Sequence, residues 1–422
     1  MKNKYSSLYI HIPFCDCICS YCDFPKLLKK TGYEEKYIEA LIFELSQLPV
    51  KTFSTIYVGG GTPTALDDNL FNRLFSYIRK NIKCLGEFSV EANPESMSYE
   101  KALLMAQNGV NRVSLGVQTI DDSILKILNR NHNANMVIKA INNIKSVGIN
   151  NVNMDFIYGL PNQDIEKLKR DIDFALSFDP NHLSFYPLQI EEGTVLFNKK
   201  VKEPLQDELD DYYEMIISKL KEKGIITVLT SGRPYGSIEK YSIQCDAMPY
   251  LIGSNGAITR NIEKDEDFFI KKLEKQKVLE ILKTIRKNNL YTTITVSGNI
   301  ITDTQKYGLI PEYRPEIIET ESLEEYIDKI ERPIIKFSIV DEEKEKLENI
   351  RKELIDKFDI TMTPVDIMGL TQKQRKVKNG YISNPYITDI MAPNTTKGDA
   401  IRNLSKYLKI DLSQTIAIGD GR

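Results

Sequence analysis

The stretch Leu8-Tyr-Ile-His-Ile-Pro-Phe-Cys-Asp-Cys-Ile-Cys-Ser-Tyr-Cys22 decides how the first half of this chain folds. Its apolar beginning is typical of a buried strand, and Cys15, Cys19 and Cys22 then follow with the spacing C-x3-C-x2-C. Thiolates are the ligands of iron–sulfur clusters, and a four-iron cluster ordinarily takes four. Three ligands in one loop therefore leave one iron open to another group. A zinc knuckle, or cysteines gathered by chance, is the alternative interpretation.

Strand-like runs alternate with amphipathic helical runs up to about residue 195. The expected strands are residues 8–14, 55–59, 86–92, 112–118, 151–158 and 182–189. The expected helices between them include residues 34–48, 68–81, 123–128 and 135–147. Six β/α units predict a parallel sheet with right-handed crossovers, in the form of a partial (β/α)6 barrel. In such barrels the chemistry lies at the C-terminal ends of the strands.

Polar or glycine residues lie at the ends of these predicted strands. The second strand runs into Gly59-Gly-Gly-Thr-Pro63, where glycines allow a ligand to approach the backbone closely. Glu91 ends the third strand, Gln118 ends the fourth, and Asp155 lies in the fifth. Each could be a simple turn or capping residue. Together they predict a ring of carboxylate and amide groups over one mouth of the barrel, suited to ribose hydroxyls and an amino group.

Bulk composition excludes some classes of function. The 422 residues carry a net charge of −3, which gives no electrostatic basis for binding nucleic acid. The sequence has no leader-like segment and no run of about 20 apolar residues, so we expect no membrane span and a cytoplasmic location. Six cysteines, four of them in one short loop, indicate a metal site in a reducing compartment better than disulfides.

Over about residues 5–220 the chain resembles one group of the radical S-adenosylmethionine (SAM) superfamily. That group is the oxygen-independent coproporphyrinogen III oxidases and their relatives, the HemW-type haem chaperones. The matching segments are the cysteine stretch, Tyr21-Cys-Asp-Phe24, Gly59-Gly-Gly-Thr-Pro63, Asn111-Arg-Val-Ser-Leu-Gly-Val-Gln118, Ile157-Tyr-Gly-Leu-Pro161 and Glu191-Glu-Gly-Thr194.

The resemblance implies two cofactors. A [4Fe–4S] cluster would be ligated by Cys15, Cys19 and Cys22, and SAM would bind its open iron. An electron from the cluster would then cleave SAM to a 5′-deoxyadenosyl radical. The SAM contacts that the resemblance implies are Tyr9, Tyr21, Gly60, Gly61, Thr62, Glu91, Gln118, Arg130 and Asp155.

Phe24 distinguishes the two branches of this group. The oxidases carry a further cysteine at that position, whereas Cys17 here lies inside the x3 gap and is not a family ligand. The sequence therefore favours the chaperone branch, which is thought to bind haem and deliver it to a client protein. An oxidase acting on a porphyrin substrate is the alternative, so whether the protein is an enzyme stays open. As haem ligands, the sequence does not separate His11, His132 and His182.

From about residue 225 the chain resembles a different family, the haloacid dehalogenase (HAD) hydrolases of the Cof type. The matching segments are Ile225-Ile-Thr-Val-Leu-Thr-Ser-Gly-Arg-Pro234, Gly253-Ser-Asn-Gly-Ala257, Pro393-Asn-Thr-Thr-Lys-Gly398 and Thr415-Ile-Ala-Ile-Gly-Asp-Gly421. This implies a Rossmann-like core carrying an α/β cap. Ser231 would hold a phosphate group, Lys397 would balance its charge, and Asp420 would help to bind Mg²⁺.

Two departures make this second part an incomplete HAD core. The family's nucleophile motif, Asp-x-Asp-Gly-Thr, does not occur in the sequence, and the sequence ends at Arg422 within the acidic motif. We therefore expect no phosphatase activity and a Mg²⁺ site that lacks some of its carboxylate ligands. We also expect a core that lacks its first strand and exposes unpaired backbone.

The sequence predicts two domains, residues 1–222 and 223–422, joined through a helix over 207–223. Within the second, the cap would span about 260–375 and the return to the core about 390–422. Because the expected remainder of both parent families is missing, our hypothesis is a chimera, from a recombined, truncated or misassembled gene.

Overall fold

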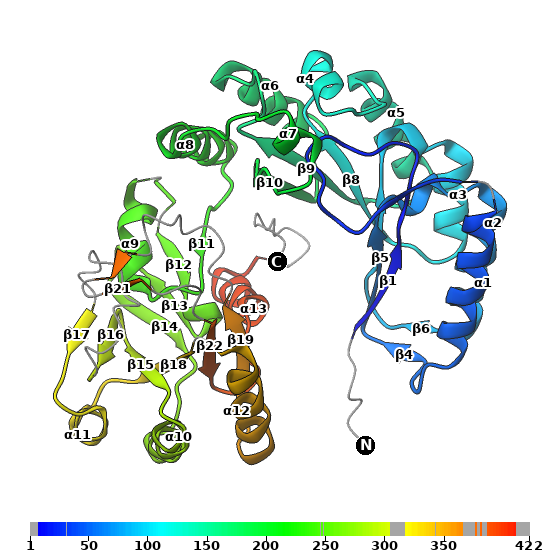
Figure 1. Ribbon diagram of the computed structural model, residues 1–422. Helices are drawn as coiled ribbons and strands as arrows, with labels where there is room; N and C mark the ends of the chain where they lie inside the picture. Colours follow the sequence, from blue (N-terminus) through cyan, green and yellow to red (C-terminus); the bar gives the residue numbers. More distant parts are fainter. Residues whose placement is uncertain are drawn as a thin grey trace. The chain divides into compact units, whose positions relative to one another are not determined.

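The computed structural model of the protein describes residues 7–30, 32–244, 246–247, 249–303, 317–341, 343–365, 376–377, 380–381 and 386–410 (Figure 1). They form two compact units, of which the first runs to Lys219 and the second begins at Leu220. The division falls inside helix α8 (Gln206–Glu222). None of the described helices is long and apolar enough to cross a bilayer.

A six-stranded parallel sheet forms the centre of the first unit. Its strand order, β1-β5-β7-β8-β9-β10, follows the chain, and every neighbouring pair is parallel. The strands are β1 (Ser7–Ile12), β5 (Thr55–Gly60), β7 (Phe88–Ala92), β8 (Arg112–Gln118), β9 (Asn151–Tyr158) and β10 (His182–Pro187). This order confirms the predicted partial (β/α)6 barrel.

Helices connect these strands, and Figure 1 shows α1, α2 and α3 together along one side of the sheet. The helices are α1 (Tyr33–Ser46), α2 (Asp68–Asn81), α3 (Tyr99–Gln107), α4 (Asp122–Ile127), α5 (Ala134–Ser146), α6 (Ile165–Leu176) and α7 (Val195–Asn198). The 3-10 turns η1 (Pro63–Ala65) and η2 (Pro94–Ser96) follow β5 and β7. Side-chain caps begin several helices: Asp67 accepts from Leu70 N at α2, and Asn133 accepts from Met136 N at α5.

Strand β8 shows why the sheet forms here. Val113, Leu115 and Val117 are fully buried, and Ser114 and Gln118 between or after them are nearly so. A strand buried on both faces is expected where helices cover one face of a parallel sheet and the barrel interior lies on the other.

The cysteine loop leaves the sheet at Pro13. The predicted strand over 8–14 is wrong as one element, because β1 ends at Ile12 and β2 (Phe14–Cys15) pairs instead with β3 (Leu27–Leu28). Proline has no N–H to donate to a strand ladder, so the chain changes partner at this point. A further short pair, β4 (Thr52–Phe53) with β6 (Lys83–Cys84), lies beyond the main sheet.

The second unit contains two larger sheets. The order of the first is β11-β12-β13-β14, with β11 (Leu229–Thr230) at one end and parallel to β12 (Tyr250–Gly253). β13 (Ile258–Asn261) and β14 (Glu266–Ile270) continue it in antiparallel fashion. Helices α9 (Tyr235–Gln244) and α13 (Lys397–Leu408) and the turn η3 (Ser254–Gly256) contact this sheet. Among the described residues β11 is an edge strand, in keeping with the expected gap in the core.

The order of the other sheet is β17-β16-β15-β18-β22-β19. Its strands are β15 (Tyr291–Val296), β16 (Asn299–Thr302), β17 (Ile317–Glu319), β18 (Ile334–Asp341), β19 (Thr361–Val365) and β22 (Tyr386–Met391). Its helices are α10 (Lys275–Lys287), α11 (Leu323–Lys329) and α12 (Lys344–Lys357), and a short pair is formed by β20 (Lys376–Val377) and β21 (Gly380–Tyr381). Because β22 pairs with β18 and β19, the cap sheet extends beyond the predicted limit of 375.

Candidate functional site

The backbone of the cysteine loop is anchored on two sides. Ser20 N donates to Leu128 O at 2.9 Å, and Asn129 Nδ2 donates to Ile18 O at 2.7 Å, which fixes the middle of the loop at the end of α4. On the other side, Lys29 N donates to Cys15 O at 3.0 Å. The loop that carries the three predicted cysteine ligands is therefore positioned by the barrel.

Two donors approach the sulfur atoms of this loop. Thr62 Oγ1 donates to Cys15 Sγ at 3.6 Å, and Arg130 Nη1 donates to Cys19 Sγ at 3.4 Å. A hydrogen bond from Cys17 and the charge of Arg130 lower the pKa of Cys19, which favours the thiolate form of this sulfur. Burial raises the pKa of Cys15 and of Cys22. Thiolate, rather than thiol, is the form that binds metals.

The glycine turn lies directly against the cysteine strand. Gly61 N donates to Ile12 O at 2.8 Å, and a Cβ at Gly61 would lie 2.6 Å from Pro13 O and 2.9 Å from Cys15 Sγ. Gly60 has φ +118°, and a Cβ there would lie 2.5 Å from the His11 ring. No side chain fits at either position, which explains why the turn consists of glycine.

Glu91 holds this glycine turn from the neighbouring strand. Its Oε2 accepts from Gly60 N at 3.0 Å and its Oε1 accepts from Tyr57 OH at 2.7 Å. Burial raises the pKa of Glu91. The predicted SAM contacts Gly60 and Glu91 are thus brought together, with Glu91 fixing the turn.

Arg130 connects the cysteine loop to the ends of three strands. Its Nη2 donates to Gly116 O at 2.6 Å and to Asn93 Oδ1 at 2.9 Å, and Asn93 Nδ2 donates to Thr62 Oγ1 at 3.1 Å. Sequence reasoning missed Asn93 as a site residue, although its place just after β7, two residues past Glu91, could have identified it. Arg130 is 8% exposed, and its Nε has no hydrogen-bond partner among the described residues.

Gln118 lies at the end of its strand, whereas Asp155 lies in the middle of its strand. Gln118, with φ 67°, is the last residue of β8, as predicted for a residue over the barrel mouth. Asp155 lies in the middle of β9 opposite Gly116, where it accepts from Ser114 Oγ at 2.9 Å and from Asn153 Nδ2 at 2.7 Å. The expectation that every candidate falls at a strand end is therefore wrong for Asp155.

The two predicted tyrosines differ in exposure. Tyr21 packs partly buried against an apolar cluster that contains Ile124 and Leu160, and burial raises its pKa well above the usual value. Tyr9 is 57% exposed, and its hydroxyl lies 2.9 Å from His11 Nδ1.

The three histidines also differ in their surroundings. His132 is buried, with Nε2 3.0 Å from Val117 O and Nδ1 3.3 Å from Glu95 Oε2. His11 contacts Tyr9 through Nδ1 and lies 3.0 Å from Pro25 O through Nε2. His182 Nδ1 lies 2.8 Å from Arg112 Nη2. His132 is the least accessible of the three to a haem iron.

The three cysteines of this loop are residues of the type that ligates an iron–sulfur cluster. In a [4Fe–4S] cluster each thiolate binds its own iron, so the ligands are spread out. Three free, partly buried thiols in one anchored loop suit that pattern, and the unpartnered Nε of Arg130 offers a donor to a bound group.

Asp171 on α6 accepts hydrogen bonds from the turns that follow two of the barrel strands. Its Oδ1 accepts from Ile120 N at 2.7 Å and from Thr119 Oγ1 at 3.0 Å, and its Oδ2 accepts from Gln163 Nε2 at 3.2 Å. It thereby ties the turn after β8 to the turn after β9. Burial raises the pKa of Asp171 to about 7 despite these hydrogen bonds.

The raised pKa predicts a pH-dependent stability. A carboxyl whose folded pKa is raised stabilises the fold fully below its unfolded pKa, and this contribution is lost as the pH rises through about 7. The free energy of unfolding should therefore fall between about pH 4 and pH 7, by up to about 1.4 kcal/mol per pH unit, and level off above that range. Asp171→Asn should flatten this profile in urea unfolding. The control is Asp173→Asn, because Asp173 lies on the same helix with a side chain that is 51% exposed, and its replacement should leave the pH profile of stability unchanged. Equal pH profiles for the two variants would contradict the assignment to Asp171.

The HAD-like motif residues gather around η3 in the second unit. Ser231 O accepts from Asn255 N at 3.0 Å, while a Cβ at Gly256 would collide with Thr396 O, next to the start of α13. Lys397 is the first residue of α13 and is exposed. Ser231 and the start of α13 thus lie on either side of one turn. Asp420 and the core return after residue 410 lie outside the described residues.

A buried ion pair joins the cap sheet to these motif residues. Lys336 Nζ lies 2.8 Å from Asp389 Oδ2 and donates to Gly232 O at 3.0 Å. Asp389 also accepts from Asn255 Nδ2 at 3.1 Å and from Ser338 Oγ at 2.6 Å. The cap and the turn after β11 are therefore held together by a satisfied polar cluster.

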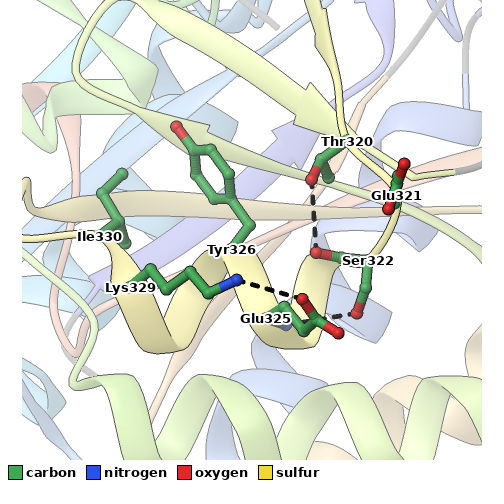
Figure 2. A pocket seen from close by; sticks show the side chains of 7 residues that line it. All are labelled: Thr320, Glu321, Ser322, Glu325, Tyr326, Lys329 and Ile330. Carbon is green, nitrogen blue, oxygen red and sulfur yellow. Dashed lines mark hydrogen bonds and ion pairs between the residues drawn. The ribbon is translucent and has the colours of Figure 1, made fainter.

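A separate hollow of about 440 Å³ lies on α11 (Figure 2). Its lining includes Glu325 and Lys329, whose exposed side chains form an ion pair of 3.2 Å within the helix. It contains none of the predicted site residues, and its chemistry is that of an ordinary solvated helix surface.

Two family profiles match this chain: the radical SAM superfamily over residues 9–175, and haloacid dehalogenase-like hydrolase over residues 193–422. The curated "Heme chaperone HemW" of Lactococcus lactis is 36% identical over 271 residues, covering 60% of this chain and 72% of the relative. The same-named protein of Buchnera aphidicola (subsp. Acyrthosiphon pisum) is 35% identical over 67% of this chain and 74% of the relative. The protein of the same name from Bacillus subtilis is 38% identical over 52% of this chain and 61% of the relative.

Solved structures of a radical SAM enzyme and of haloacid dehalogenase-like hydrolases are also similar to parts of this chain. Coproporphyrinogen III oxidase from Escherichia coli has a TM-score of 0.48 at 23% identity, covering 61% of this chain and 65% of that one. A haloacid dehalogenase-like hydrolase from Bacteroides thetaiotaomicron has a TM-score of 0.39 at 22% identity, covering 50% and 73%. From its sequence relatives and family profiles, the chain belongs to the HemW family of radical SAM proteins in its first part and to the haloacid dehalogenase-like hydrolases in its second.

Proposed function

We propose that Cys15, Cys19 and Cys22 hold a [4Fe–4S] cluster with SAM at its open iron, and that the protein binds haem and passes it to a client protein. The observation that carries the proposal is the anchored three-cysteine loop, in which Arg130 and Thr62 donate to two of the sulfurs. When bound, such a cluster supplies one electron at a time to SAM. The chain's own residues orient and shield that chemistry.

Each of these residues has a definite task in the proposal. Gly60 and Gly61 let the turn pack directly against His11 and the cysteine loop, so that its backbone lies beside the proposed cluster ligand Cys15, and Glu91 keeps the turn in place. Arg130 places positive charge beside Cys19 and joins the loop to the strand ends through Asn93. Asp155 and Gln118 offer polar groups toward the ribose and amino group of SAM.

Phe24 supports haem transfer over oxidation of a porphyrin. It stands where the related oxidases have a cysteine, and it is 64% exposed. To test the proposal, haem is titrated into anaerobically purified protein while its visible spectrum is recorded. Saturable binding with a shifted haem band is expected, and coproporphyrinogen III should keep its carboxylates when SAM and a reductant are supplied. Loss of carbon dioxide from that substrate would instead establish the oxidase alternative.

We propose that the second unit does not hydrolyse phosphate esters. The turn with Ser231 and Lys397 is retained, but a covalent phosphoryl transfer needs a nucleophile, and Asp-x-Asp-Gly-Thr is absent from the sequence. Release of p-nitrophenol from p-nitrophenyl phosphate with Mg²⁺ should stay at the rate without protein. Turnover that depends on Mg²⁺ and is lost in Lys397→Ala would disprove this prediction.

A further inference from the structure

Asn93 connects the two side chains that donate to sulfurs of the cysteine loop. Its Oδ1 lies 2.9 Å from Arg130 Nη2, and its Nδ2 lies 3.1 Å from Thr62 Oγ1. Arg130 Nη1 in turn donates to Cys19 Sγ at 3.4 Å. Thr62 Oγ1 donates to Cys15 Sγ at 3.6 Å. One amide therefore lies between the hydrogen bonds that reach two of the three proposed cluster ligands.

The chemistry of the neighbouring groups fixes the orientation of the Asn93 amide. A guanidinium has only N–H donors, so the amide atom that faces Arg130 must be the acceptor Oδ1. The donor Nδ2 then faces Thr62, and the hydroxyl oxygen has to accept from it. Because a hydroxyl has a single proton, the proton of Thr62 is left to point at Cys15 Sγ. Asn93 thus directs the Thr62 proton to this sulfur.

Backbone contacts and close packing hold Asn93 in this position. Its carbonyl oxygen accepts from Ser96 N at 3.1 Å and from Ser96 Oγ at 3.0 Å, at the start of η2. On β8, a Cβ at Gly116 would lie 3.1 Å from Asn93 Oδ1 and 3.3 Å from Arg130 Nη2. Thr62 is 4% exposed and Arg130 is 8% exposed, so these hydrogen bonds are shielded from water.

We propose that Asn93 is a positioning residue that sets the reduction potential of the iron–sulfur cluster; the inference rests on the proposed function. Hydrogen bonds donated to the cysteine sulfurs stabilise the reduced cluster, because the added electron increases the negative charge on those sulfurs, and they therefore raise its potential. Asn93 acts on this potential through Thr62 and Arg130, whose donors it holds toward the sulfurs.

The test compares midpoint potentials of reconstituted proteins in anaerobic redox titrations, in which EPR measures the reduced cluster. At the wild-type midpoint potential, the ratio of reduced to oxidised cluster should fall at least about threefold in Asn93→Leu, because both donors lose a fixed partner. Leucine is close to asparagine in size but has no hydrogen-bonding atom in its side chain. SAM is left out of the titration, so that a contact between Asn93 and SAM cannot cause the shift.

Asn108→Leu is the matched control for a lost buried amide. Asn108 is 6% exposed, and its amide accepts from Ser76 Oγ at 3.2 Å and donates to Asn72 Oδ1 at 3.2 Å. It therefore joins the end of α3 to α2 and makes no contact with the sulfur donors. Asn108→Leu should lower the free energy of unfolding, but its midpoint potential should equal that of wild type.

Replacements of Thr62 test the route through its hydroxyl. Thr62→Val removes the proton that points at Cys15 and should lower the midpoint potential, whereas Thr62→Ser keeps a hydroxyl and should stay near the wild-type value. In the Thr62→Val background, Asn93→Leu should lower the potential by less than it does in the wild-type background, because the route through the hydroxyl is already lost.

The outcomes separate this inference from the proposed function. If wild-type protein takes up no four-iron cluster, the proposed function itself fails. If wild type holds the cluster and Asn93→Leu has the same midpoint potential, or shifts it equally in both backgrounds, the inference is overturned. If Asn93→Leu loses the cluster, Asn93→Asp takes its place in the same comparison, since aspartate still accepts from Arg130 but cannot donate to Thr62. Its added charge acts in both backgrounds, so equal shifts again overturn the inference and a smaller shift with Thr62→Val supports it.

Discussion

Replacing Cys19 by serine is expected to abolish the iron–sulfur cluster of this protein. Cys19 is the sulfur that receives the hydrogen bond from Arg130, and this hydrogen bond and the charge of Arg130 help to lower the pKa of Cys19 and so favour its thiolate form. A hydroxyl in its place stays protonated and leaves one iron without its ligand. Iron and sulfide analysis after anaerobic reconstitution should find wild-type content near four irons per chain and almost none in Cys19→Ser.

Cys17→Ser is the sharpest control for this experiment. Cys17 lies in the same loop, is partly buried like the three proposed ligands, and donates to Asn129 O at 3.4 Å. Because it falls outside the C-x3-C-x2-C spacing, its replacement should leave the iron content unchanged. Loss of the cluster in Cys17→Ser, together with its retention in Cys19→Ser, would mean that the ligand set is assigned wrongly.

Replacing Lys336 by methionine is expected to destabilise the second unit by about 3–5 kcal/mol. The side chains of Lys336 and Asp389 are only 9% and 3% exposed, so the substitution leaves a carboxylate buried without its partner cation. Asn255 and Ser338 can donate to that carboxylate, but neither balances its charge. Hydrogen exchange of the amides in β18 and β22 should become faster by at least about a hundredfold.

Lys329→Met provides the comparison, because the ion pair of Lys329 with Glu325 is 75% and 73% exposed. Exposed pairs of this kind contribute about 0.5 kcal/mol or less. The double variant Lys336→Met/Asp389→Leu should recover part of the lost stability, since the unpaired charge is gone. Similar exchange rates in the Lys336→Met and Lys329→Met variants would show that the buried pair does not hold the cap sheet.

The fold of the first unit could largely be predicted from local sequence. The strands Arg112–Gln118 and Asn151–Tyr158 and the helix Asp68–Asn81 agree with their predicted limits. These strands are apolar runs bordered by polar residues, and the helix begins after a capping aspartate. The break at Pro13 could also have been expected, since proline interrupts a strand ladder.

The contacts between distant residues could not be predicted in the same way. The cysteine spacing is visible because its residues are neighbours in the chain. The connection from Arg130 through Asn93 to Thr62 joins the ends of different strands, and nothing in the sequence marks them as partners. The same is true of Lys336 and Asp389, which lie 53 positions apart.

The division between the two compact units falls inside helix α8. Lys219 Nζ lies 3.8 Å from Asp173 Oδ1 in the first unit, and Lys221 Nζ donates to Asp246 O at 2.9 Å in the second. The two ends of this stretch of α8 thus contact different units. The chimeric-gene hypothesis stays a prediction, and long reads across the junction at its genomic locus would test it.

The most direct test of the central claim is electron paramagnetic resonance of the reconstituted, reduced protein before and after SAM is added. The account predicts the signal of a reduced four-iron cluster, with a change in its g-values when SAM binds the open iron. A protein without such a cluster, or a cluster whose signal ignores SAM, would contradict the assignment of Cys15, Cys19 and Cys22 and of the glycine turn beside them.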